Sequence, residues 1–245
     1  MTGVETLRQW IQESKQAVFL GGAGVSTASG IPDFRSAHGI YQQKKAGLSY
    51  EEMLSHGYFV RHTEEFYRFY RDVMLYPGAR PNGAHYALAK LEQEGKLRAV
   101  VTQNIDGLHQ LAGSQNVLEL HGSELRNTCL SCGKKYGMEK ILQSEGVPTC
   151  TCGGVIKPDV VLYGEQLNEG DLRKAIRYAA EADLMIVAGT SLVVYPVAGL
   201  VEYLRAGAKL AIVNRDPTPY DGKADLVIRE DLVAVLEGCA GIAQG

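Results

Sequence analysis

Short apolar runs of strand length recur along this chain, and segments with helical periodicity separate most of them. The runs are residues 16–20, 97–101, 117–120, 184–188, 209–213 and 226–228. Strands that alternate with helices form βαβ units, in which each crossover covers one face of a parallel sheet. The alternation therefore predicts an α/β fold, with a Rossmann-like, mostly parallel sheet and helices on both faces.

Two segments interrupt the alternation. Residues 40–94 are mainly helical and rich in aromatic side chains, and a helix from Asn82 to Glu94 should return the chain to the sheet. The second segment, residues 123–157, holds four of the five cysteines and several glycine turns. We expect a single domain whose Rossmann-type core comprises about residues 1–35, 80–122 and 158–245. The insertions, about residues 36–79 (helical) and 123–157 (metal-binding), should form a small second domain.

The overall composition argues against several classes of protein. With 45% hydrophobic and 22% charged residues, the chain is globular rather than disordered or fibrous. A net charge of −3 gives no broad electrostatic reason to bind nucleic acid or an anionic membrane. The N-terminus lacks the apolar run of a secretory signal, and no other run approaches the roughly 20 residues that span a bilayer. We expect a cytoplasmic protein without membrane contact or direct nucleic-acid binding.

The loop after the first predicted strand is glycine-rich, with the sequence GGAGVSTASG at residues 21–30. Glycines at a strand-to-helix junction let backbone N–H groups approach a pyrophosphate. The loop departs from the dinucleotide fingerprint, because Thr27 takes the third glycine position and no acidic residue convincingly ends a second strand. Nucleotide binding is favoured over a turn that serves only tight packing.

Polar side chains follow the second and third predicted strands. Gln103, Asn104 and Asp106 come after one strand, and His121 comes after the next. Open α/β sheets bind ligands at this edge. Asp106 could equally be an ordinary helix N-cap, and a lone histidine is more often structural, although imidazole suits proton abstraction near neutral pH.

Three more segments belong to the same edge. In IPDFR, residues 31–35, a ring could exclude water and a guanidinium could meet phosphate, although a surface turn would use the same residues. Small hydroxyl residues follow the fourth strand at 189–191, and Asn214 follows the fifth; these residue types are also ordinary in loops. The convergence of six such loops predicts a ligand site better than any single motif does.

The cysteines form the strongest single pattern. Cys129 and Cys132 make a CxxC pair, and after seventeen residues Cys150 and Cys152 make a CxC pair. Four thiolates on two short turns suit a closed tetrahedral zinc site, which leaves no coordination position for a substrate. We expect one structural Zn²⁺, with redox-active or merely buried thiols as the alternative. Cys239 stands apart and should be a buried thiol.

Taken together, these motifs resemble the sirtuin (Sir2-type) family in a compact bacterial or archaeal form. The segments occur in family order: GAGVSTASGIPDFR at 22–35, TQNID at 102–106, HG at 121–122, IKPDVVLYGE at 156–165, GTSLVVYP at 189–196 and IVN at 212–214. With the cysteines they cover nearly the whole chain. The resemblance implies an NAD-dependent protein lysine deacetylase that acts on acetyl-lysine proteins or peptides.

The resemblance also implies roles for individual residues. His121 and Asn104 would be catalytic, with His121 as the general base. NAD would contact Ala23, Thr27, Asp33, Phe34, Arg35, Gln103, Asn104, Ile105, Asp106, His121, Gly189, Thr190, Ser191, Asn214, Asp231 and Leu232. The acyl peptide would add as an extended strand along Val160, Tyr163, Gly164 and Val193. Such binding works mainly through the peptide backbone, so substrate choice should depend little on sequence.

In the chemistry that the resemblance implies, the acetyl-lysine oxygen attacks C1′ of the nicotinamide ribose as nicotinamide leaves. His121 then activates a ribose hydroxyl, and the products are lysine, nicotinamide and O-acetyl-ADP-ribose. An NAD-dependent ADP-ribosyltransferase would use the same cofactor loops, but His121 and the peptide groove argue against it. A non-catalytic zinc-ribbon protein would leave the polar strand-end residues unexplained, and a dehydrogenase lacks an obvious hydride partner site.

The acyl preference depends on one helix position. Sirtuins that prefer succinyl or malonyl lysine share a Tyr-x-x-Arg motif; here Tyr67 fits the tyrosine, but Tyr70 occupies the arginine position and Arg71 lies one residue later. One step along a helix turns a side chain by about 100°, so Arg71 should miss the pocket. We expect a preference for acetyl or other neutral acyl groups, with longer neutral chains as an alternative.

Overall fold

A six-stranded parallel sheet forms the centre of the protein in the computed structural model, which describes residues 2–34, 39, 44–45 and 47–242. Its strand order is β11-β10-β9-β1-β4-β5, and every neighbouring pair is parallel. The strands are β1 (Ala17–Gly21), β4 (Ala99–Thr102), β5 (Val117–Glu119), β9 (Leu184–Ala188), β10 (Lys209–Val213) and β11 (Leu226–Ile228). Each predicted strand is therefore confirmed, with ends shifted by at most two residues. This is the doubly wound Rossmann order, and the winding reverses between β1 and β9.

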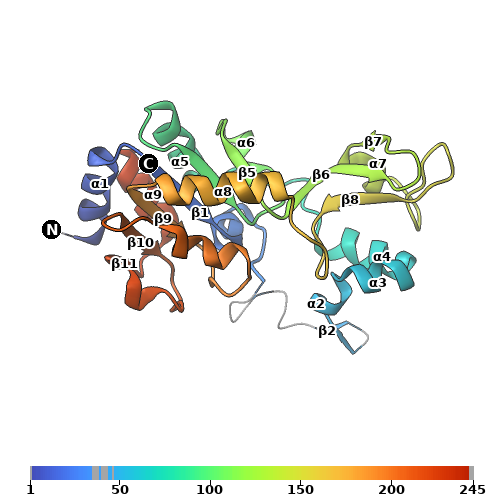
Figure 1. Cartoon of the computed structure of the whole chain (residues 1–245). Helices are drawn as coiled ribbons and strands as arrows, with labels where there is room; N and C mark the ends of the chain where they lie inside the picture. The colour runs from blue at the N-terminus through green and yellow to red at the C-terminus, as the bar shows by residue number, and fades with distance from the viewer. Residues whose placement is uncertain (1, 35–38, 40–43, 46, 243–245) are drawn as a thin grey trace.

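Helices cover both faces of the sheet, as the alternation predicted (Figure 1). One face packs against α1 (Gly3–Glu13), α5 (Gly83–Gln93) and α9 (Leu232–Ala240), and the other against α8 (Glu169–Glu181) and the 3₁₀ segment η3 (Val197–Tyr203). In β1, Ala17 and Phe19 join the first apolar cluster, while Val18 and Leu20 join the second. Because both faces are buried, the strands are continuous apolar runs, which is why the sequence reveals them.

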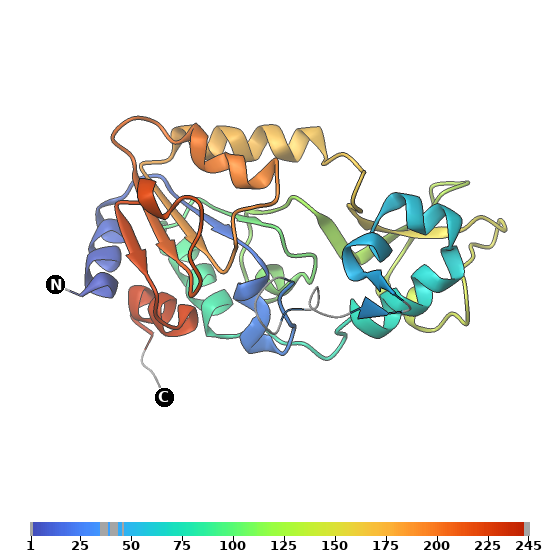
Figure 2. The same cartoon turned by 90° about the horizontal axis from the view of Figure 1, so that it is seen from below.

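Most of the remaining elements form what we call the small module, which extends from one side of the sheet (Figure 2). Its antiparallel sheet has the order β7-β6-β8, and short helices pack nearby. The elements are β2 (Lys44–Lys45), β3 (Leu48–Ser49), α2 (Tyr50–Met53), α3 (His56–Arg61), α4 (Thr63–Val73), β6 (Gly122–Cys129), β7 (Lys135–Tyr136), α7 (Met138–Leu142) and β8 (Ile156–Val160). Both insertions contribute to one apolar cluster, which contains Phe66 and Tyr67 beside Ile141 and Ile156.

The connections contain short helical turns. The glycine-rich loop forms a 3₁₀ segment, η1 (Ala23–Ser29), and two others are α6 (Leu108–Leu111) and η4 (Asp221–Lys223). The predicted helix from Asn82 is α5, and the Asn82 side chain accepts a hydrogen bond from the Ala84 backbone N–H as its N-cap. Across the described ranges, no helix is both long enough and apolar enough to span a bilayer.

Candidate active site

A cavity of about 1250 Å³ lies at the carboxyl edge of the parallel sheet and reaches the small module. Loops that follow all six strands of the parallel sheet contribute lining residues, which lie within 22–34, 103–106, 121, 189–191, 194–196, 213–216 and 230–233. Residues 160–167 and the end of α4 complete the wall. The predicted convergence of the strand-end loops on one site is therefore confirmed.

Most of the residues that the sequence singled out line this cavity. They are Ala23, Thr27, Asp33, Phe34, Gln103, Asn104, Ile105, Asp106, His121, Val160, Tyr163, Gly164, Gly189, Thr190, Ser191, Asn214, Asp231 and Leu232. Val193 does not line it; its side chain is 49% exposed, next to Val194, which does. Arg35 lies outside the described residues.

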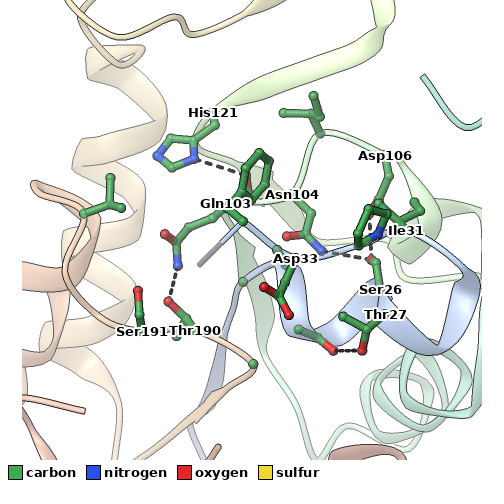
Figure 3. A pocket seen from close by; sticks show the side chains of 18 of the residues that line it. Ser26, Thr27, Ile31, Asp33, Gln103, Asn104, Asp106, His121, Thr190 and Ser191 are labelled. Carbon is green, nitrogen blue, oxygen red and sulfur yellow. Dashed lines mark hydrogen bonds between the residues drawn. The ribbon is translucent and has the colours of Figure 1, made fainter. Parts of the chain in front are cut away.

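His121 is oriented by the main chain of the neighbouring strand end. Its Nδ1 lies 3.1 Å from the carbonyl oxygen of Gln103 (Figure 3). A carbonyl oxygen only accepts hydrogen bonds, so Nδ1 carries the proton and the neutral ring has its lone pair on Nε2. The backbone is fixed as well, because the carbonyl of His121 accepts from the N–H of Val161 at 2.9 Å. This tautomer makes Nε2 the basic atom of a ring that lines the cavity.

Ser26 is the centre of a buried polar network in the cavity wall. Its hydroxyl donates to Asp106 Oδ2 at 2.6 Å and accepts from Asn104 Nδ2 at 3.0 Å (Figure 3). Asp106 Oδ1 accepts from the N–H of Leu108 at 2.9 Å. Gly107, and not Asp106, is the N-cap of α6; one Asp106 oxygen still accepts the first N–H of that helix, and the other fixes the network.

Two buried histidines lie behind this network. His85 Nε2 is 3.5 Å from Ser26 Oγ, and the rings of His85 and His109 are 4.8 Å apart. Burial lowers the pKa of His85 to about 4, although the Asp106 carboxylate opposes the shift. Burial, and secondarily His85, lowers the pKa of His109 to about 3. Both rings are therefore neutral near pH 7.

The glycine loop packs directly on the loop that follows β9. Gly24 donates to the carbonyl of Gly189 at 2.8 Å, and a Cβ on Gly24 would lie 2.7 Å from Gly189 Cα. Gly189 has φ +60°, and its Cβ would lie 2.6 Å from the backbone nitrogen of Val25. Gln103 Nε2 donates to Thr190 Oγ1 at 2.9 Å across the same junction (Figure 3). These glycines therefore serve the close packing of two loops at the switch point, and this packing shapes the cavity floor.

Polar residues from β10 and α9 complete the far end of the cavity. The Asn214 side chain donates to the carbonyl of Asp216 at 2.8 Å. Asp231 caps α9, because its Oδ1 accepts from the N–H groups of Val233 and Ala234 at 3.0 Å each. Both side chains thus hold their own loops in shape at the cavity wall.

The segment after β8 runs between the sheet and the small module. The N–H of Tyr163 donates to the carbonyl of Leu54 at 3.0 Å, and the carbonyl of Tyr163 accepts from the N–H of His56 at 2.9 Å. Gly164 then turns the chain with φ +89°. The junction of α2 and α3 therefore holds this part of the wall in place.

The four clustered cysteines fit one metal ion. Their Sγ atoms all lie within 4.8 Å of one another, and the Cys129–Cys152 and Cys132–Cys150 pairs are 3.5 and 3.6 Å apart. Tetrahedral zinc with Zn–S bonds of about 2.3 Å separates its sulfurs by about 3.8 Å. A four-thiolate site with this spacing suits structural zinc, as the sequence predicted. Cys239 is buried away from the quartet, and burial raises the pKa of its thiol to about 12.

Arg71 does not reach the cavity. Its guanidinium donates to the carbonyl of Gly146, and it lines a separate small pocket together with Glu64 and Asp72. The structure thus keeps Arg71 out of the cavity lining, and the preference for neutral acyl groups stays a prediction. Tyr67 is fully buried and donates to the carbonyl of Ile156, so it does not line the cavity either.

The sequence reasoning missed several residues of the wall. Ser26 stood inside the glycine loop without being singled out, although it is a buried hydroxyl at its centre. Val73, Met74 and Tyr76 line the cavity from the end of α4, and Glu124 lines it from β6. Nothing in the local pattern marks these four, because only the packing of the small module brings them to the sheet edge.

Comparisons with known proteins agree with this geometry. Residues 22–196 match the model of the Sir2 family. An NAD-dependent protein deacetylase of Clostridium acetobutylicum is 54% identical over 238 residues, which are 96% of each chain. A solved Sir2 complex with a p53 peptide and NAD⁺ is 44% identical, with a TM-score of 0.87 over 99% of this chain and all of that one. Another, with a deacetylated p53 peptide and 3′-O-acetyl-ADP-ribose, is 44% identical, with a TM-score of 0.89 over 96% of both chains. The chain belongs to the Sir2 family, the sirtuins.

Proposed function

We propose that this chain is an NAD-dependent protein lysine deacetylase that uses His121 as its general base. The observation that carries the proposal is the placement of His121. The Gln103 carbonyl fixes its tautomer, and the ring shares one cavity with Asn104 and the loops of a dinucleotide-binding sheet. A general base must first lie in the right orientation, and only then does its pKa decide how well it works. The hydrogen bond to the Gln103 backbone carbonyl gives the His121 ring such an orientation.

The relatives support the reaction. A protein 54% identical over nearly its whole length is named an NAD-dependent protein deacetylase. Sir2 structures at 44% identity hold NAD⁺ with a p53 peptide, or a deacetylated p53 peptide with 3′-O-acetyl-ADP-ribose. The second complex contains the two products expected when an acetyl group passes from lysine to ADP-ribose.

The residues present fit NAD along the carboxyl edge of the sheet. Bound NAD supplies the ribose carbon that accepts the acetyl oxygen, with nicotinamide as the leaving group. The phosphates and adenosine would lie against Ala23, Thr27, Gly189, Thr190, Ser191, Asn214, Asp231 and Leu232. The nicotinamide end would lie against Asp33, Phe34, Gln103, Asn104, Ile105 and Asp106. Arg35 is assigned to the phosphates on the resemblance alone.

The residues around the ribose have separate tasks. Nε2 of His121 would take the proton of a ribose hydroxyl. Asn104 is held by Ser26, so its amide would keep the sugar in one orientation. Phe34 would exclude water from the reacting carbon. The Ser26 network would hold Asp106 in place at the nicotinamide pocket.

The acetyl-lysine peptide would lie as an extended strand between residues 160–164 and 193–195. Strand addition uses backbone hydrogen bonds, so it recognises little of the peptide sequence. We expect neutral acyl groups to be preferred, because Arg71, the candidate cation for an acidic acyl group, donates to Gly146 and does not line the cavity.

The zinc site would be structural, because four thiolates complete its coordination. The separate apolar clusters of the sheet faces and the small module support the division into a core of about residues 1–35, 80–122 and 158–245 with insertions at 36–79 and 123–157. Reduced, metal-binding thiols suit the cytoplasm, and the charge of −3 does not favour nucleic acid.

The test is turnover of an acetyl-lysine peptide with NAD. We expect free lysine peptide, nicotinamide and O-acetyl-ADP-ribose in equal amounts, and loss of about 10²- to 10⁴-fold in kcat for His121→Ala. His62→Ala is the control, because His62 is exposed and does not line the cavity. Both variants should retain one zinc per chain. ADP-ribose attached to the peptide, found by mass spectrometry, would instead identify an ADP-ribosyltransferase, and an unmodified peptide would refute the proposal.

A further inference from the structure

Glu124 is a buried acidic side chain in the cavity wall to which the proposed reaction gives no role. It is only 4% exposed and lies in β6, three residues after His121. Tyr70 and Tyr76 lie near it, and Val73 and Met74 line the same cavity from the end of α4. An acidic group among apolar and aromatic side chains is costly to bury, so its presence there needs an explanation.

An irregularity in β6 brings Glu124 to the cavity. Ser123 pairs with Asp159 of β8, but the next pairing joins Asn127 to Pro158, so residues 124–126 have no partners on β8. The N–H of Glu124 donates instead to the carbonyl of Ile105 at 3.0 Å. A bulge of this kind redirects a side chain that a regular strand would aim elsewhere. Glu124 is thereby attached to the loop that carries Asn104 and Asp106.

The surroundings keep the carboxyl group of Glu124 uncharged near neutral pH. Burial, and secondarily the Asp106 carboxylate, raises the pKa of Glu124 to about 8. Burial also raises the pKa of Tyr70 and Tyr76, and Glu124 contributes to both shifts, so these two hydroxyls lie near it. Within residues 2–34, 39, 44–45 and 47–242, no side chain forms an ion pair or hydrogen bond with the Glu124 carboxyl.

The two acidic residues of this wall differ in what their oxygens contact. Both oxygens of Asp106 are engaged, by Ser26 and by the N–H of Leu108. The uncharged Glu124 carboxyl group can instead donate one hydrogen bond and accept another from a ligand bound beside it in the cavity. Glu124 lines the same cavity as His121, so under the proposed function an acyl chain longer than acetyl would extend along the wall that holds Glu124.

We propose that Glu124 selects the acyl group: it favours acyl-lysines whose chain carries a hydroxyl group over chains of equal length that are purely apolar or end in a carboxylate. This inference rests on the proposed deacylase function. A hydroxyl can both donate to and accept from the carboxyl group. An apolar chain would bury that group without a partner, and a terminal carboxylate would be buried close to the charged Asp106 carboxylate.

The test compares four acyl forms of one peptide: acetyl, butyryl, 3-hydroxybutyryl and succinyl. We expect kcat/KM of the wild-type protein to be about fivefold higher for 3-hydroxybutyryl than for butyryl, the size of one net hydrogen bond. Glu124→Leu should abolish this preference by raising butyryl turnover and lowering 3-hydroxybutyryl turnover. Glu124→Gln should keep it, because the amide has the same shape and also donates and accepts. Succinyl should be the poorest substrate of the wild-type protein.

Acetyl-peptide turnover separates this inference from the proposed function. Acetyl turnover shows whether each protein is an active deacylase, and the ratio of 3-hydroxybutyryl to butyryl kcat/KM within each protein reports on residue 124. No acetyl turnover by the wild type would refute the deacylase itself. Normal acetyl turnover with the same 3-hydroxybutyryl to butyryl ratio in wild type and Glu124→Leu would overturn the role of Glu124. A change confined to nicotinamide inhibition would also overturn it, by assigning Glu124 to the leaving group.

Discussion

Single residues decide how the polar side chains of the cavity wall are held, and Ser26 connects two of them, Asn104 and Asp106. Ser26 is only 1% exposed, and its hydroxyl accepts a hydrogen bond from the Asn104 amide and donates one to the Asp106 carboxylate. Asn104 also receives support from Thr102, whose hydroxyl accepts its backbone N–H at 3.0 Å. Positioning a substrate to within an ångström is worth large factors in rate, so a group that only holds other groups still affects turnover.

Removing this hydroxyl should affect both stability and turnover. Ser26→Ala leaves the buried groups of Asn104 and Asp106 without their shared partner, so we expect a loss of about 1–3 kcal/mol in the free energy of unfolding. Deacetylation kcat/KM should fall by about tenfold or more, because Asn104 loses its fixed orientation. Urea unfolding and steady-state kinetics measure the two effects. Ser144→Ala, remote from the cavity, should cost less than about 0.5 kcal/mol, and equal losses in the two variants would contradict the role given to Ser26.

The sequence predicted Asn104 and Asp106 as site residues but not the residue that joins them. Asn104 and Asp106 follow a strand end, where polar side chains are conspicuous. Ser26 lies 78 residues from Asn104 and 80 from Asp106, among other small residues of a glycine loop. No local pattern connects such positions, so only the folded chain shows that these three side chains act together.

Among the elements, α5 and α6 contact each other through two neutral histidines. His85 of α5 and His109 of α6 are fully buried, and His109 also packs edge-on against Phe19 of β1 at 6.3 Å. The groups that face the pair are Ser26 and Asp106 on the cavity side. Since burial holds both pKa values below the usual 6.5, the folded state favours the uncharged form of both rings.

This pair should make the protein sensitive to acid. As the pH falls below about 6.5, both histidines bind protons in the unfolded chain. In the folded protein, His85 binds its proton only near pH 4 and His109 only near pH 3. The contribution of the two histidines to the free energy of unfolding is therefore complete above pH 6.5. Below that pH it falls by up to about 1.4 kcal/mol per pH unit for each histidine. His109→Gln should reduce the slope of unfolding free energy against pH, measured by urea unfolding between pH 6.5 and 4.5. His62→Gln changes an exposed histidine outside the pair, and an equal change of slope in both variants would count against this account.

Elements differ in how far the sequence predicts them. The strands of the parallel sheet were found because burial on both faces makes them continuous apolar runs. The strands of the small module were missed. β6 carries the buried polar residues Ser123, Glu124 and Asn127 and contains a pairing irregularity, and β7 is only two residues long. Their stability comes from packing against α4 and from the cysteine cluster, neither of which has a strand-like period.

At the scale of the whole molecule, the switch point between β1 and β9 joins the two halves of the sheet and forms the floor of the cavity. Gly24 and Gly189 meet there at backbone contact distance, and a Cβ on either would lie under 3 Å from main-chain atoms of the other loop. The main-chain ladder continues past the strand ends, because Gly22 donates to Ala188 at 3.2 Å and Gly189 donates to Val213 at 3.2 Å. Separating these loops would therefore change the cavity and the sheet together.

Gly189→Ala should test this coupling. Gly189 combines φ +60° with a neighbouring backbone atom 2.6 Å from the position of an added Cβ, whereas Gly207 has φ +82° with nothing within 4 Å. Gly207→Ala should thus show only the conformational cost of a left-handed residue, about 1–2 kcal/mol. Gly189→Ala should lose at least about 1 kcal/mol more, because the loops must also move apart. Its affinity for NAD, measured by calorimetry, should fall by about tenfold or more while that of Gly207→Ala stays unchanged. If both variants bound NAD like the wild type, the close contact of the two loops would not shape the dinucleotide site, and the glycines would serve packing alone.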